Sequence, residues 1–186
     1  LSGIRGVGKT TTARLIAQAI NCNKNFIQGE KCNPVEYCSC KEIGEFKNLD
    51  VLEIDGASKT GIDSIRELIE SSSYAPINAK YKVIILDEVQ MLSKQAFNGL
   101  LKTLEEPPPH LKFIFATTEV KKIPVTIISR CQRFDLHRIS IKILFDYLKK
   151  ISKIENGNIS DSAITLIAKA GEGSVRDALS LLDRAL

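Results

Sequence analysis

The chain has 186 residues, 44% of them apolar, which is enough for one well-packed core and a small second unit. Lysine and arginine (26) exceed aspartate and glutamate (22), but a formal charge of +4 is too small to indicate nucleic-acid binding by itself. No stretch approaches the roughly 18 consecutive apolar residues of a membrane helix, and no leader pattern opens the sequence, so we expect a cytoplasmic protein without membrane contact.

Segments with helix and strand periodicity alternate along most of the chain, which is typical of an α/β fold with a parallel sheet flanked by helices. In chain order the pattern predicts a helix over 13–20, a strand over 51–54, a helix over 62–69, a buried strand over 82–86, a helix capped by Ser93 and a strand over 113–116. From about residue 138 only helical patterns follow, interrupted by a turn at 155–158. We therefore expect a nucleotide-binding domain over residues 1–139 and a helical domain over residues 140–186.

The stretch GIRGVGKTT matches the phosphate-binding loop G-x-x-x-x-G-K-[ST] in full. Such a loop follows a strand, so we expect the first strand to be missing. The sequence stops within a helical pattern, so we also expect the helical domain to be truncated. The glycines let backbone N–H groups surround phosphates, the lysine neutralises them, and the threonine hydroxyl can bind magnesium. A glycine-rich turn before an ordinary helix is the alternative. We assign nucleotide binding to Gly3, Gly6, Gly8, Lys9, Thr10 and Thr11.

Two adjacent carboxylates, Asp87 and Glu88, end the buried strand in VIILDEVQ. An α/β sheet presents its ligands at the carboxyl ends of its strands. We expect Asp87 to hold magnesium and Glu88 to polarise an attacking water, which fits ATP hydrolysis better than phosphate transfer to an alcohol. A solvated acidic strand end is the alternative.

The next strand ends in FATTE, which places Thr117 and Thr118 at the same edge of the sheet. Either hydroxyl could bind the attacking water or the γ-phosphate, and we choose Thr118. Threonines also cap strand ends without any such role.

Six motifs in one order carry a family resemblance: the GKT loop, DEVQML, LLKTLEEPP, FATTE, SRC and GSVRDAL. Together they resemble the AAA+ clamp-loader ATPases of bacterial DNA replication. The resemblance implies a P-loop NTPase (AAA+) fold followed by a helical lid, with ATP and magnesium as cofactors. It implies a motor subunit, and not the polymerising subunit, of a replicative polymerase holoenzyme. Another AAA+ ATPase, such as a branch-migration motor, and a catalytically silent scaffold subunit are the alternatives.

The resemblance also implies partners: the other subunits of a hetero-pentameric loader, a sliding clamp, primed DNA and, in a longer form, the polymerase core. Lys59 and Lys102 lie where family members present DNA contacts, although ordinary solvated lysines are the alternative at each position.

Two arginines stand in family motifs. Arg130 of SRC is implied to be a finger that acts in trans on the ATP of the adjacent subunit, where a guanidinium stabilises transition-state charge. The alternative is a surface arginine paired with an acid of its own chain. The resemblance implies that Arg176 of GSVRDAL is a second phosphate-sensing arginine, with a solvated helix arginine as the alternative. The capping-box spacing of Ser174 and Asp177 predicts it in the first turn of a helix.

Four of the five cysteines fall between residues 22 and 40. In a cytosolic chain such clustering favours a metal over disulfides, and four thiolates suit a structural, tetrahedral zinc. The family carries a four-cysteine zinc module at this place, but the spacing C-x5-C-x-C departs from its usual pattern. We expect the ligands to be Cys22, Cys32, Cys38 and Cys40, with unligated cysteines as the alternative. Cys131 is predicted to be a packed thiol.

Overall fold

The computed structural model describes residues 1–22, 38–44, 48–58 and 61–186, and it divides into two compact units. The first, called here the sheet unit, contains Leu1 and Thr10–Phe134. The second, called the helical unit, contains Ser2–Lys9 and Asp135–Leu186. None of the helices in the described ranges is long and apolar enough to cross a membrane.

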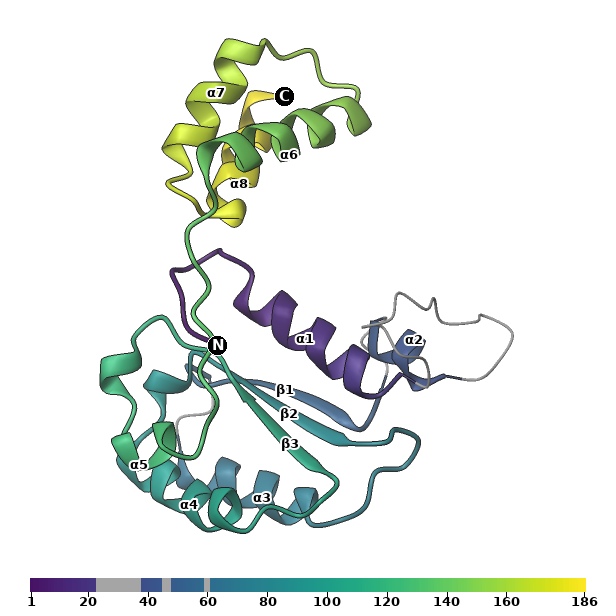
Figure 1. Cartoon of the computed structure of the whole chain (residues 1–186), viewed down its shortest axis with the longest axis vertical. Coiled ribbons are helices and arrows are strands. Elements are labelled where there is room, and N and C mark those ends of the chain that lie inside the picture. Colours follow the sequence, from purple (N-terminus) through teal and green to yellow (C-terminus); the bar gives the residue numbers. More distant parts are fainter. Residues whose placement is uncertain (23–37, 45–47, 59–60) are drawn as a thin grey trace. The chain divides into compact units, whose positions relative to one another are not determined.

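A parallel sheet of β1 (Val51–Asp55), β2 (Lys82–Asp87) and β3 (Leu111–Phe115) forms the centre of the sheet unit (Figure 1). The central strand β2 is an unbroken apolar run from Val83 to Leu86 that is fully buried. Parallel sheets are covered on both faces, so such a strand needs no polar alternation. The α/β fold with a parallel sheet, predicted from the sequence, is confirmed.

Helices cover both faces of this sheet (Figure 1). On one face lie α1 (Lys9–Ile20) and α2 (Ser39–Gly44), and Ala13, Ala17 and Ile43 pack against the strand residues Val83 and Ile85. On the other lie α3 (Ile62–Ser72), α4 (Lys94–Glu105) and α5 (Val125–Ile128), which pack against the alternate residues of β2. Alternation along β2 therefore divides the core into two layers.

Local signals set the ends of these helices. The Ser93 hydroxyl accepts a hydrogen bond from Ala96 N at 3.1 Å, so it caps α4 as its sequence position predicts. The helix ends at Glu105, before the proline run that begins at Pro107.

An ion pair joins α1 to the sheet: the Arg14 guanidinium makes two 2.6 Å hydrogen bonds to Glu53 on β1. These hydrogen bonds raise the pKa of Arg14, and the pair joins helix and strand.

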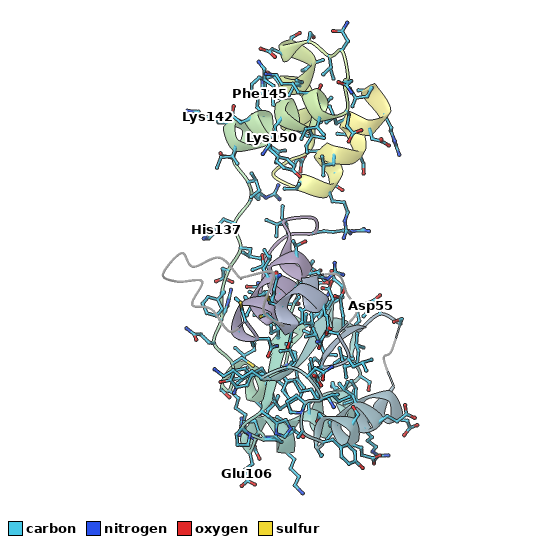
Figure 2. All side chains as sticks on the ribbon, turned by 90° about the vertical axis from the view of Figure 1, so that its right-hand side faces the viewer. Asp55, Glu106, His137, Lys142, Phe145 and Lys150 are labelled. Carbon is cyan, nitrogen blue, oxygen red and sulfur yellow. The ribbon has the colours of Figure 1, made fainter. Side chains whose placement is uncertain are left out.

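The helical unit packs three helices around a small apolar core. They are α6 (Ile141–Ile154), α7 (Asp161–Ala170) and α8 (Val175–Ala185), each preceded by a serine whose hydroxyl caps the helix. Leu144 and Leu148 of α6 meet Ile164 of α7 and Leu182 of α8 in this core. Figure 2 marks Lys142, Phe145 and Lys150 along α6; both lysines are exposed, whereas the phenylalanine is partly buried.

Candidate functional site

Polar side chains gather at the carboxyl edge of the sheet, inside the sheet unit. Asp55 and Asp87 are register partners at the ends of β1 and β2 (Asp55 is labelled in Figure 2). The Asp87 carboxylate accepts a 2.5 Å hydrogen bond from the hydroxyl of Thr10, which lies in the first turn of α1. The structure therefore brings together a hydroxyl and a carboxylate, 77 residues apart in sequence, that both suit a magnesium ion.

Glu88 follows Asp87 in an unusual backbone conformation. Its φ of 46° and ψ of 44° lie in the left-handed region, which residues other than glycine rarely adopt. Two hydrogen bonds hold this turn: Glu88 N donates to the Asp87 carboxylate at 2.9 Å, and Val89 N donates to Ala116 O at 3.0 Å. The fold thus maintains local strain at the residue expected to act on water.

Gly56 allows the loop after β1 to lie directly against this turn. Its N–H donates to Asp87 O at 2.8 Å. A Cβ at this position would stand 2.7 Å from Glu88 O and 3.0 Å from Asp87 O, both of them backbone atoms. Glycine is therefore required here by close backbone approach, a role that sequence reasoning had not assigned.

The side chain of Gln90 links the two strand ends. It lies in η2 (Val89–Met91), the single turn after β2, and its amide contacts Glu88, Thr117 and Thr118. Thr118, chosen from the sequence as the residue near the reacting phosphate, donates to the Glu88 carboxylate at 3.1 Å. Sequence reasoning missed Gln90; the only available signal was an amide two residues beyond an expected catalytic carboxylate.

The glycine-rich loop that is expected to bind phosphates lies in the helical unit. Gly6 and Gly8 have φ values of 75° and 98°, a backbone region that glycine adopts without penalty. Lys9 is buried, and its ammonium donates 3.1 Å hydrogen bonds to the carbonyls of Gly3 and Ile4. These contacts hold the lysine head within the loop, while Thr11 is exposed on α1.

The start of α8 packs against this loop within the helical unit. Val175 N donates to Gly6 O at 3.0 Å, and a Cβ at Gly6 would overlap the Ser174 hydroxyl. Ser174 accepts from Asp177 N, which places the exposed Arg176 in the first turn of α8. Only half of the capping box forms, because Ser174 N donates to Gly171 O instead. The helix start carrying Arg176 therefore contacts the glycine-rich loop.

Arg130 follows α5 at the surface of the sheet unit. Its guanidinium donates to Thr126 O and to the Glu105 carboxylate, both at 2.7 Å. The arginine is thus paired with an acid of its own chain, the alternative that the sequence left open, while staying partly exposed. Neighbouring Cys131 is half-buried, and burial raises the pKa of its thiol, as expected of a packed cysteine.

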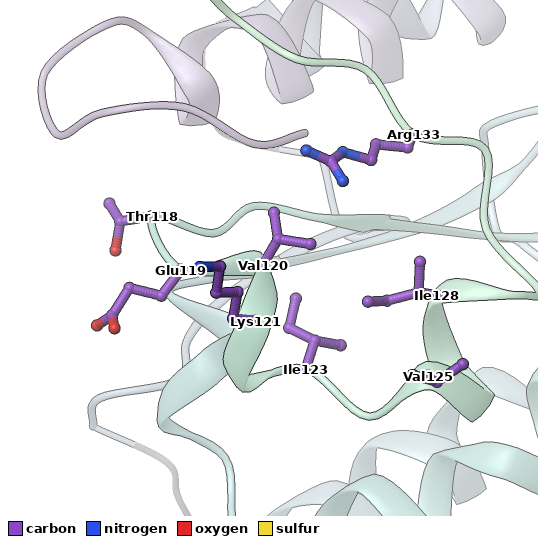
Figure 3. A pocket seen from close by; sticks show the side chains of 8 residues that line it. All are labelled: Thr118, Glu119, Val120, Lys121, Ile123, Val125, Ile128 and Arg133. Atoms are coloured by element: carbon purple, nitrogen blue, oxygen red, sulfur yellow. The ribbon is translucent and has the colours of Figure 1, made fainter.

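A shallow groove runs between Thr118 and Arg133 (Figure 3). Its apolar floor is formed by the side chains that follow β3, including Ile123, Val125 and Ile128. Figure 3 shows Thr118 and Glu119 at one end of the groove. The threonine at the strand end is therefore accessible from the surface.

Three of the expected zinc ligands come together in the sheet unit. The sulfurs of Cys22, Cys38 and Cys40 lie within 4.8 Å of one another, and those of Cys22 and Cys38 are 3.7 Å apart. With Zn–S bonds of about 2.3 Å, the edge of a tetrahedral thiolate site is about 3.8 Å, so this spacing fits zinc. Cys32 lies outside the described residues.

Of the two lysines that are candidates for DNA contact, one lies within the described residues. Lys102 is exposed on α4, where it is available to a partner. Lys59 lies outside the described residues.

Comparisons with known proteins cover both units. Residues 1–140 match the family described as "DNA polymerase III, delta subunit", and residues 144–186 match "DNA polymerase III clamp loader subunit, ATPase lid domain". The chain is similar to DNA polymerase III subunit gamma of Buchnera aphidicola (subsp. Acyrthosiphon pisum), with 50% identity over the whole chain and 51% of that relative. It is 50% identical to subunit tau of Bacillus subtilis and 46% identical to that of Escherichia coli, again over the whole chain, covering 32% and 28% of them.

Solved structures share the fold at lower identity. The Thermotoga maritima Holliday junction branch migration motor RuvB superposes with a TM-score of 0.68 at 21% identity, over 98% of this chain and 52% of that one. A DNA polymerase III gamma subunit-related protein of the same organism gives a TM-score of 0.55 at 24% identity, over 94% and 57%. These likenesses support the fold alone. The chain spans about half or less of the length of the curated relatives described above.

Proposed function

Since this chain belongs to the DNA polymerase III clamp-loader subunits, with gamma and tau subunits among its relatives, we propose that it is an ATP-hydrolysing motor subunit that loads a sliding clamp onto primed DNA. The observation that carries this proposal is the cluster at the sheet edge. There the Thr10 hydroxyl contacts Asp87, and Glu88 and Thr118 share a hydrogen bond beside them.

Each group has a distinct task in this proposal. The backbone N–H groups of the loop from Gly3 to Gly8 and the ammonium of Lys9 bind the phosphates of ATP. Thr10 and Asp87 hold magnesium, which supplies positive charge to the β- and γ-phosphates when bound. Because the two oxygens already lie 2.5 Å apart, a small separation would let both face one cation.

Glu88 accepts a hydrogen bond from the attacking water and takes its proton as the water oxygen bonds to the γ-phosphorus. Thr118 places a hydroxyl beside the same carboxylate and orients the water or the γ-phosphate. The adjacent pair Asp87 and Glu88 separates the two tasks, since one carboxylate faces the cation and the other the nucleophile.

Two arginines connect hydrolysis with assembly and nucleotide state. We assign Arg130 to the ATP of the adjacent subunit, where its guanidinium stabilises charge on the transferring phosphoryl group. The guanidinium is exposed and is held by Thr126 O, by the Ser129 hydroxyl at 3.4 Å and by the partly exposed Glu105, and this exposure supports the role. We assign Arg176 to phosphate sensing, supported by the packing of its helix start on Gly6.

A structural zinc on Cys22, Cys38 and Cys40, with Cys32 as fourth ligand, would join the end of α1 to α2 and stabilise this part of the sheet unit. The proposed partners are the other loader subunits in a hetero-pentamer, the sliding clamp, primed DNA and, in a longer form, the polymerase core, all in the cytoplasm. Lys59 and Lys102 would contact the DNA backbone.

ATP turnover by the full-length protein in its assembled loader, with clamp and primed DNA present, tests the proposal. We expect Glu88→Gln, which keeps the size of the side chain and removes its charge, to abolish turnover while ATP still binds. Lys9→Ala should instead weaken ATP binding. A wild-type assembly without DNA-stimulated turnover would contradict the motor function and favour a scaffold.

A further inference from the structure

The Gln90 amide makes hydrogen bonds with three side chains of the sheet edge. Its Nε2 donates to Glu88 Oε2 at 2.5 Å and to Thr118 Oγ1 at 3.0 Å. Its Oε1 accepts from Thr117 Oγ1 at 2.6 Å. All four residues belong to the sheet unit. The glutamine therefore uses both ends of its amide on the groups expected to carry out hydrolysis.

Glu88 and Thr117 together determine which way the amide of Gln90 points. This threonine is buried, and its Oγ1 accepts a 3.0 Å hydrogen bond from Glu119 N. A carboxylate can only accept hydrogen bonds, so Gln90 has to turn its NH₂ group to Glu88 and its carbonyl oxygen to Thr117, whose hydroxyl donates to it. The NH₂ group consequently faces Glu88 and Thr118, and each of its two hydrogens has an acceptor.

The result is a closed triangle of side chains. Thr118 Oγ1 accepts from Gln90 and donates to Glu88 Oε2, so both donors converge on one carboxylate oxygen. Among the described residues no hydrogen bond reaches Glu88 Oε1, which leaves that oxygen for water. The left-handed backbone of Glu88 and the two donors together fix where its carboxylate lies.

We propose that Gln90 is a positioning residue for ATP hydrolysis, which holds the Glu88 carboxylate and the Thr118 hydroxyl as one unit toward a common water. The inference rests on the proposed ATPase function and extends it to a residue that does not touch the reacting atoms. Preorganised groups accelerate a reaction because they need not be ordered in the transition state. Loss of the amide should therefore lower kcat and leave ATP affinity unchanged.

The side-chain type matters at this position. Gln90→Leu keeps the approximate size but supplies no donor to the carboxylate. Gln90→Glu keeps the shape but places a second negative charge at hydrogen-bonding distance from Glu88, which favours moving that carboxylate away. We expect the glutamate variant to be more impaired than the leucine variant, although it retains an acceptor for Thr117.

Steady-state ATP turnover of the full-length protein in its assembled loader, with clamp and primed DNA, measures the effect. For Gln90→Leu we expect kcat to fall about 10- to 100-fold, as when a supporting hydrogen bond to a catalytic group is removed. KM for ATP should stay close to wild type, whereas the thermal midpoint should fall modestly because the buried Thr117 hydroxyl loses its acceptor. Gln95→Leu, at an exposed glutamine on α4, is the matched control and should leave turnover unchanged.

A double-mutant cycle distinguishes positioning from general support. If the triangle acts as one unit, Gln90→Leu combined with Thr118→Val should lower kcat little more than the more severe single variant. Additive losses, an unchanged kcat, or a kcat that rises would each overturn the inference. Its failure is separate from failure of the proposed function, which would appear as absence of turnover in the wild-type loader.

Discussion

Alanine at Arg130 provides the sharpest test of action in trans. The substitution removes the hydrogen bonds to Thr126 O and to the Glu105 carboxylate. The side chain of Arg130 is 34% exposed and that of Glu105 is 50% exposed. Exposed ion pairs contribute about 0–1 kcal/mol to stability. The variant should therefore fold and bind ATP much as wild type does.

The expected catalytic loss is far larger than this. An arginine supplied to a transferring phosphoryl group changes the rate by about 10³–10⁵, which corresponds to about 4–7 kcal/mol at 1.36 kcal/mol per tenfold. Loss of a surface ion pair worth about 1 kcal/mol could change a rate only about fivefold. A role in trans and a role as a surface ion pair therefore predict losses of turnover rate that differ by orders of magnitude.

The assay compares nucleotide affinity of the isolated full-length subunit with turnover in the assembled loader. We expect Arg130→Ala to leave the nucleotide affinity of the isolated subunit within twofold of wild type. ATP turnover at the adjoining site of the assembled loader should be strongly reduced. Glu105→Gln is the control, because it removes the charge that pairs with Arg130 and keeps the shape of the side chain. Equal, small losses for the two variants would refute the trans role and leave a simple surface ion pair.

Three other substitutions test separate contacts. Thr10→Val removes the hydroxyl that contacts Asp87, so we expect lower turnover and a higher magnesium requirement, measured by magnesium titration. Gly56→Ala introduces a Cβ at 2.7 Å from Glu88 O, and we expect a stability loss of about 1–3 kcal/mol in denaturant titration, together with lower turnover. Cys22→Ser should release zinc, as measured by metal analysis, and lower the thermal midpoint, and a metal-free wild-type protein would contradict the zinc site.

The strands and most helices could be predicted from the sequence because each carries a strong local signal. The apolar run of β2 is too continuous for an exposed strand, and Ser93 and Pro107 mark the two ends of α4. Placement of Asp87 at the sheet edge followed from the same run, since a parallel strand presents its carboxyl end to ligands.

Pairwise contacts between distant residues were beyond sequence reasoning. Gln90 and Thr118 are 28 residues apart, and Arg130 and Glu105 are 25 apart. No periodicity encodes such pairs, because they depend on how strand-end turns and helix termini meet after the sheet has formed. Gly56 is a similar case, as its need for a small side chain arises only from the backbone of β2 nearby.

These contacts give a reason for the strained backbone at Glu88, directly after β2. In the proposed mechanism the Asp87 carboxylate faces magnesium, whereas the carboxylate of the next residue, Glu88, faces water. The left-handed turn at Glu88 provides this change of direction within one residue. A strained turn persists only where the surroundings over-determine it. Gly56 packs against its backbone and Gln90 holds its side chain, so both should influence hydrolysis without contacting ATP. A substitution at Gly56 or Gln90 that altered stability without changing ATP turnover would contradict this link between the strained turn and hydrolysis.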